Sequence, residues 1–119
     1  MKSLLIVAHG SRRSASNEEV VRLADSVAQK PQNTFDHVQC AFLELAKPSI
    51  PEGILDCVEK GSTHIAILPY FLAAGRHVIE DIPHEVSLAK CDPDKVVIEI
   101  KPHVGADINM PETLLNMTL

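Results

Sequence analysis

The architecture of this chain is predicted most directly by IAILPYFLAAGRHVIEDIP, residues 65–83. Its first four residues are all apolar, which is typical of a strand buried on both faces of a parallel sheet. Pro69 cannot donate a hydrogen bond to a neighbouring strand, so we expect the strand to end there. The following loop carries Arg76 and His77 at the carboxyl end of this strand, where open α/β sheets bind their ligands.

Three further strand patterns alternate with helical patterns along the chain. These strands are expected at residues 3–8, 36–43 and 96–100. The first of them and residues 65–68 are the most uniformly apolar, so these two belong in the centre of the sheet, and the other two suit its edges. Right-handed helical crossovers then predict one α/β domain over residues 1–119, a flavodoxin-like half-domain with a four-stranded parallel sheet of order 2-1-3-4 and helices on both faces.

Helix boundaries are expected where capping residues precede apolar residues at helical spacing. Two S-x-x-E capping boxes are expected to begin helices, Ser16 with Glu19 and Ser49 with Glu52. A third helical pattern follows His77; it should direct Ile79 and Ile82 inward and break near residues 81–83. A short last helix over residues 111–117 would lie in a tail that we expect to be weakly ordered from about residue 105.

The composition argues against several classes of function. A net charge of −5 and an aromatic content of 3% disfavour nucleic-acid binding, which needs a basic surface and often stacking rings. The N-terminal apolar run, residues 4–8, is far shorter than a membrane-spanning helix or a signal-peptide core, so we expect no membrane association and a cytoplasmic location. The three cysteines are odd in number and form no C-x-x-C pair, and we interpret them as small buried side chains.

Candidate functional residues collect at the predicted carboxyl edge of the sheet. His9 follows the strand at residues 3–8 as His77 follows the strand at residues 65–68. Neighbouring strands lie about 5 Å apart, so both imidazoles should face the crevice at the switch point, with Glu44 on the same rim. Two neutral imidazoles and a carboxylate suit a divalent transition metal, or they act as proton acceptors near neutral pH, and both interpretations stay open.

Several cations share this rim. They are Arg12, Arg13, Lys47 and Arg76, and their presence in an acidic protein indicates an anionic ligand. Ser11 lacks a surrounding G-x-S-x-G turn, so we expect it to form hydrogen bonds in its loop rather than act as a nucleophile. The absence of G-x-G-x-x-G and Walker sequences gives no support to nucleotide binding.

Three sequence blocks together resemble a known family. They are LIVAHGSR at residues 5–12, FLELAKPSI at residues 42–50, and LPYFL at residues 68–72 with GRH at residues 75–77 and DIP at residues 81–83. In this order they resemble the small sirohydrochlorin chelatases of the CbiX type, over roughly the first hundred residues.

The resemblance implies a class II chelatase, a lyase that inserts a divalent metal into sirohydrochlorin without ATP. Cobalt(II), for cobalamin biosynthesis, is the first choice, and iron(II) and nickel(II) are used by other family members. It implies that His9 and His77 bind the metal and, with Glu44, carry the catalysis. It also implies no cofactor beyond the substrate metal, and a homodimer that encloses the wide tetrapyrrole. Substrate carboxylates would be bound by Ser11 and the four rim cations.

Two other classes of function compete with this interpretation. One is a carrier of metal or tetrapyrrole that keeps the fold without turnover. The other is a phosphate-handling enzyme, because His9 and Gly10 lie near arginines as in the R-H-G motif of histidine phosphatases. Ala8 stands where that motif needs arginine, which disfavours the phosphatase.

Overall fold

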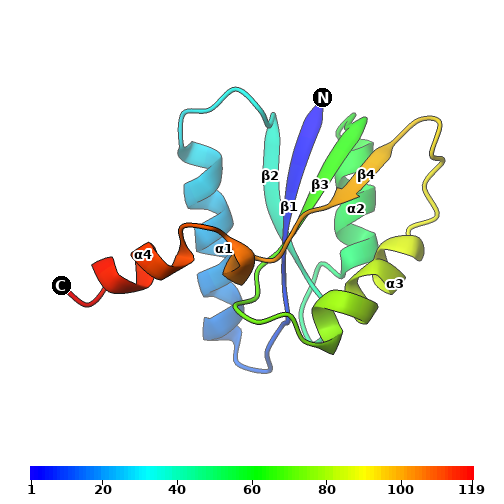
Figure 1. The fold of residues 1–119 in the computed structure, drawn as a ribbon. Helices are drawn as coiled ribbons and strands as arrows, with labels where there is room; N and C mark the ends of the chain where they lie inside the picture. Colours follow the sequence, from blue (N-terminus) through cyan, green and yellow to red (C-terminus); the bar gives the residue numbers. More distant parts are fainter.

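The computed structural model describes residues 1–119, which form one parallel sheet with helices on both of its faces (Figure 1). The strands are β1 (Lys2–Ala8), β2 (His37–Phe42), β3 (His64–Pro69) and β4 (Val97–Ile100). They are arranged in the order β2-β1-β3-β4, and all three neighbouring pairs are parallel. The predicted order, the two central strands and the end of β3 at Pro69 are therefore confirmed.

The helices cover both faces of the sheet and form a hydrophobic core with each face. They are α1 (Ser14–Gln29), α2 (Ile50–Glu59), the π-helical turn η1 (His77–Asp81), α3 (Ile82–Ser87), the 3-10 turn η2 (Val104–Ala106) and α4 (Met110–Asn116). Helix α1 packs on one face over Ile6, Ala8 and Phe42. Helices α2 and α3 cover the other face, where Leu5, Val7 and Ile67 are fully buried (Figure 1). Strand residues thus alternate between the two cores, as both-face burial requires.

One of the two predicted capping boxes is present. Ser49 accepts a hydrogen bond from the backbone of Glu52, whose carboxylate accepts one from the backbone of Ser49, so α2 begins as predicted. The box of Ser16 and Glu19 is wrong, because α1 begins at Ser14 and no side chain caps it. The preceding loop is held instead by Asn17, which exchanges two hydrogen bonds with the backbone of Ser11.

The segment after His77 departs from regular helical geometry. Ile82 is fully buried and α3 begins there. The predicted break at residues 81–83 is wrong, because the backbone stays helical through Asp81 and Ile82 and only changes from π-helical to α-helical geometry. Ile79 was expected to point inward, but 66% of it is exposed. The wider π-helical turn η1, closed by a hydrogen bond from the Ile82 N–H to the His77 carbonyl, rotates the helix face and turns Ile79 outward.

The C-terminal segment forms short helices in the region expected to be weakly ordered. η2 contacts the loop before His77, where the Gly105 N–H donates to the Phe71 carbonyl oxygen. Helix α4 then projects from the molecule (Figure 1) with no buried residue. None of the helices combines the length and the apolar character needed to cross a lipid bilayer. Cys40 and Cys57 are buried as predicted, whereas Cys91 is only partly buried.

Candidate active site at the carboxyl edge of the sheet

The topology brings three chain segments to one edge of the sheet. β1 pairs with β2 on one side and with β3 on the other, and in this register Ala8 lies beside Phe42 and Val7 beside Pro69. His9 therefore emerges between the loop that carries Glu44 and the loop that leads to His77. This is the point where successive crossovers run in opposite directions, the usual ligand site of an open α/β sheet.

The structure brings the two imidazoles of this edge into contact. The ring centroids of His9 and His77 are 4.7 Å apart, and the ring planes meet at 73°. Their side chains are 40% and 48% exposed. Both rings are thus half-open to an incoming ligand while the fold sets their separation.

His9 has a different partner at each ring nitrogen. Its Nδ1 lies 2.9 Å from the carbonyl oxygen of Gly10, which can only accept, so this contact favours a proton on Nδ1. Its Nε2 lies 3.2 Å from Oε1 of Glu44. A lone pair and a carboxylate oxygen at this distance repel each other unless a proton or a metal ion lies between them, so the pair is suited to bind either cation.

The position of Glu44 depends on Gly10. Gly10 has a φ of +93°, and a Cβ there would overlap the carbonyl oxygen of Glu44. The Glu44 N–H also donates to the His9 carbonyl oxygen at 3.0 Å, which joins the two loops through their backbones. The close approach of His9 and Glu44 therefore requires a residue without a side chain at position 10.

His77 has a carboxylate partner that the sequence interpretation missed. Its Nδ1 lies 2.8 Å from Oδ2 of Asp81, four residues later in η1. A carboxylate at i+4 from a histidine was visible in the sequence, because residues at that spacing are neighbours on a helix. The sequence pattern alone indicates only that Asp81 lies near a helix break.

The predicted rim cations lie on the expected loops, and all four are exposed. Arg12 and Arg13 precede α1, Lys47 follows β2, and Arg76 precedes His77. Arg76 also pairs with Glu80 at 3.7 Å across one exposed turn. Ser11 lies inside its loop, where its hydroxyl accepts a hydrogen bond from the Arg13 N–H at 3.0 Å. This supports the expectation of loop hydrogen bonding for Ser11.

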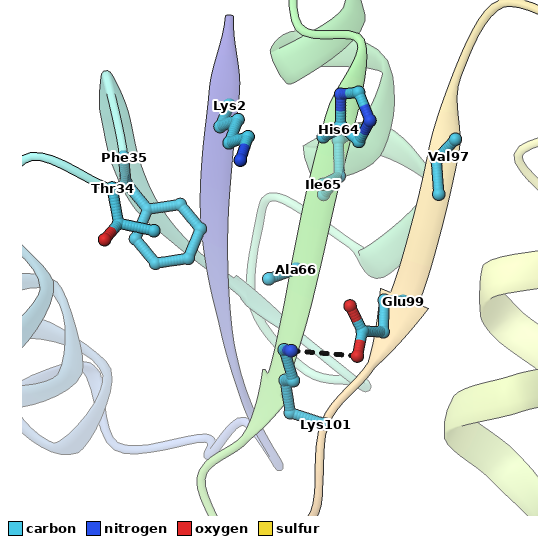
Figure 2. Close-up of a pocket in the computed structure, with 9 residues that line it drawn as sticks. All are labelled: Lys2, Thr34, Phe35, His64, Ile65, Ala66, Val97, Glu99 and Lys101. Atoms are coloured by element: carbon cyan, nitrogen blue, oxygen red, sulfur yellow. Dashed lines mark hydrogen bonds and ion pairs between the residues drawn. The ribbon is translucent and has the colours of Figure 1, made fainter.

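The edge offers an open pair of imidazoles rather than a closed cage. No group of three or more histidine, cysteine, aspartate or glutamate side chains is arranged to hold a metal ion. A hollow of about 160 Å³ lies elsewhere, over β3 and β4 on the α1 side of the sheet, and includes His64, Glu99 and Lys101 (Figure 2). Figure 2 shows that Lys101 turns toward Glu99, with which it forms a 2.8 Å ion pair. The hollow contains neither His9 nor His77, so it is separate from the candidate site.

Fold and site define a flavodoxin-like α/β protein with a two-histidine site at its switch point. The family model of CbiX matches residues 3–118, so the chain belongs to the CbiX family. A sirohydrochlorin cobaltochelatase of Methanocaldococcus jannaschii is 39% identical over 88 residues, 74% of this chain and 60% of that protein. The chloroplastic sirohydrochlorin ferrochelatase of Arabidopsis thaliana is 40% identical over 83 residues, 67% of this chain and 35% of that protein. The chain spans 60% to 64% of the length of the cobaltochelatase relatives.

Solved structures have the same fold. The sirohydrochlorin chelatase SirB from Bacillus subtilis subspecies spizizenii, in complex with cobalt, superposes with a TM-score of 0.83 at 27% identity. That comparison covers 98% of this chain and 49% of SirB. A putative cobalamin biosynthesis CbiX protein from Marinobacter aquaeolei superposes with a TM-score of 0.81 at 24% identity, over 99% of this chain and 94% of that one. The second likeness concerns the fold alone.

Proposed function

We propose that this chain is a sirohydrochlorin chelatase that inserts a divalent metal ion without ATP, with cobalt(II) as the first choice. The observation that carries the proposal is the pair of half-exposed imidazoles, with centroids 4.7 Å apart, at the switch point of the sheet. Membership of the CbiX family and the relatives named as sirohydrochlorin cobaltochelatases support it.

The reaction exchanges one metal ion for two protons on the pyrrole nitrogens. Nε2 of His9 and Nε2 of His77 are the proposed ligands that hold the ion before it enters the ring. The ion must then leave the protein, and a site with few protein ligands and open positions suits a transient ion better than a closed cage does. Glu44, 3.2 Å from His9, would help to hold the ion, and the two imidazoles freed when the ion leaves would each accept one of the two pyrrole protons, with Glu44 stabilising the charge on His9.

The rim cations would orient the tetrapyrrole. Sirohydrochlorin carries eight carboxylates, and the exposed residues Arg12, Arg13, Lys47 and Arg76 lie on the same three loops as His9, Glu44 and His77. Charge-assisted contacts at its periphery would hold the ring over the imidazoles without blocking its central nitrogens. Ser11 would contribute by holding the loop that bears Arg12 and Arg13.

Iron(II) is the second candidate metal. Relatives named as sirohydrochlorin ferrochelatases, from Priestia megaterium and Arabidopsis thaliana, are 36% and 40% identical to this chain. Imidazole and carboxylate ligands bind iron(II), cobalt(II) and nickel(II) with similar geometry, so a direct comparison of the three metals is part of the test.

We also propose that residues 1–119 form one domain that acts as a homodimer in the cytoplasm. The site lies at an open edge, and a tetrapyrrole is wide compared with one four-stranded sheet. A second copy would cover the other face of the ring. α4 supports the homodimer because its Leu114 and Leu115, 54% and 67% exposed, are available for such a contact. Light scattering after size exclusion would test this, and a fully active monomer would contradict it.

The function is tested by mixing the purified protein with sirohydrochlorin and cobalt(II), iron(II) or nickel(II) and following the visible spectrum. The proposal predicts faster metallation than in a protein-free control, and loss of that acceleration in His9→Ala and His77→Ala. Arg76→Ala should raise KM more than it lowers kcat, because Arg76 is proposed to bind substrate only. Tight binding of sirohydrochlorin without any acceleration would contradict the enzyme and favour a carrier.

A further inference from the structure

The hydrogen bond between His77 and Asp81 determines which nitrogen of His77 carries the proton. An ionised carboxylate only accepts hydrogen bonds, so the 2.8 Å contact requires the proton on Nδ1. Nε2 is then the nitrogen with the free lone pair. An imidazole in water without a partner prefers the opposite tautomer, so Asp81 selects the less common form.

His9 is held in the same tautomer by a different group. The carbonyl oxygen of Gly10 accepts from Nδ1 of His9 at 2.9 Å. The two imidazoles, 4.7 Å apart, would therefore both offer Nε2 to one metal ion, which at His9 would take the place of a proton between Nε2 and Glu44. A backbone carbonyl and a carboxylate are the two groups that most often orient histidines toward a metal.

We propose that Asp81 is a positioning residue, which fixes the tautomer and the ring orientation of His77 so that its Nε2 can bind the divalent substrate metal. This inference rests on the proposed function. The turn η1 makes the arrangement possible, because its hydrogen bond from the Ile82 N–H to the His77 carbonyl sets Asp81 beside the ring. Ile82 is fully buried and anchors the turn in the core, while Asp81 remains 43% exposed.

The same turn provides a matched control. Glu80 precedes Asp81, is exposed, and pairs with Arg76 at 3.7 Å rather than with His77. Removing either carboxylate changes the charge by one unit in almost the same place. Only the removal of Asp81 takes a hydrogen-bond acceptor away from His77. Differences between Asp81→Ala and Glu80→Ala therefore report on that hydrogen bond and not on the general electrostatic potential.

The first test uses the metal-free protein labelled with 15N-histidine, at a pH where the rings are neutral. Long-range 1H–15N correlations distinguish the two tautomers of each ring. The expected result is Nδ1–H for His77 in the wild type and in Glu80→Ala, and a shift toward Nε2–H in Asp81→Ala, with His9 unchanged. An Nε2–H form of His77 in the wild type, or a tautomer that stays the same in Asp81→Ala, would overturn the inference.

The second test measures cobalt(II) binding by competition with a chromophoric chelator, followed by metallation of sirohydrochlorin. Asp81→Ala should lose about 10-fold to 100-fold in cobalt(II) affinity. Asp81→Asn should recover part of the loss, because its amide oxygen still accepts from Nδ1, and Glu80→Ala should match the wild type. If the wild type accelerates metallation and Asp81→Ala binds cobalt(II) and metallates as the wild type does, the role of Asp81 is refuted and the proposed function stands. Asp81-dependent cobalt binding without metallation would refute only the proposed function.

Discussion

Replacing Gly10 with alanine tests the close contact between the loops that carry His9 and Glu44. Gly10 has a φ of +93°, and an added Cβ would overlap the carbonyl oxygen of Glu44 and approach its carbonyl carbon to 2.9 Å. The obstacle is backbone, held by hydrogen bonds from the N–H groups of Leu43 and Glu44 to the carbonyls of Ala8 and His9 at 2.9 and 3.0 Å. It cannot rotate away as a flexible side chain would.

The size of the effect follows from two separate penalties. A residue with a Cβ in left-handed backbone costs roughly 1–2 kcal/mol. Forcing an additional carbon into a packed contact costs roughly 1–3 kcal/mol. The free energy of unfolding of Gly10→Ala should therefore fall by about 2–5 kcal/mol, a large part of the roughly 5–15 kcal/mol typical of a whole domain.

Urea unfolding at pH 7 measures this change, and Gly75→Ala is the matched control. Gly75 lies in the loop before His77, has no left-handed φ, and a Cβ there would meet no atom within 4 Å. Its replacement should leave stability unchanged or raise it by up to about 1 kcal/mol. Gly10→Ala should also weaken cobalt(II) binding, because the Glu44 loop must move away from His9. If the free energy of unfolding of Gly10→Ala lies within about 0.5 kcal/mol of that of Gly75→Ala, the predicted overlap with the Glu44 backbone is refuted.

Four further predictions concern other parts of the chain. Gly105→Ala should slow metallation because its Cβ would overlap the Leu72 carbonyl and push on the loop before His77; an unchanged rate would contradict this coupling. Ser49→Ala should lower the free energy of unfolding by about 1 kcal/mol through loss of the α2 cap. The backbone N–H of Ser49 donates to the Glu52 carboxylate and lowers the pKa of Glu52 from its ordinary 4.5. The ionised carboxylate therefore contributes to stability above pH 4.5, and this contribution is lost as the pH falls through the lowered pKa. The urea midpoint of Glu52→Gln should vary less with pH in this range than that of the wild type. Burial raises the pKa of all three thiols, and the half-buried Cys91 should react with iodoacetamide before the two buried cysteines, as peptide mapping would show.

The fold was predictable because the buried strands of this chain have almost entirely apolar sequences. The apolar runs at residues 4–8 and 65–68 correspond to β1 and β3, which lie between two layers of helices. The mixed composition of β2 and β4 indicated edges, and the edges are where they lie. Since parallel strands end at one edge, the strand order predicted His9 and His77 at the same edge, while their contact also depends on the loop and the turn η1 after β3.

What could not be predicted depends on contacts between segments far apart in the sequence. The S-x-x-E pattern at Ser16 gave no sign that Asn17 would hold the Ser11 loop and start α1 earlier. The π-helical turn that exposes Ile79 depends on how the segment packs after its loop. The 3.6-residue period of the apolar residues carries no information on that packing. The spacing of His77 and Asp81 was visible in the sequence. A carboxylate four residues after a histidine indicates a functional site only when a second imidazole lies beside that histidine, and the sequence does not show this contact.

The central claim is that His9 and His77 act on one metal ion. Metallation rates of His9→Ala, His77→Ala and the double variant, each above the protein-free rate, test it most directly. Residues that hold one ion act as a unit, so the double variant should lose about as much rate as the slower single variant. Losses that multiply in the double variant would show that the two imidazoles act independently and would contradict the claim.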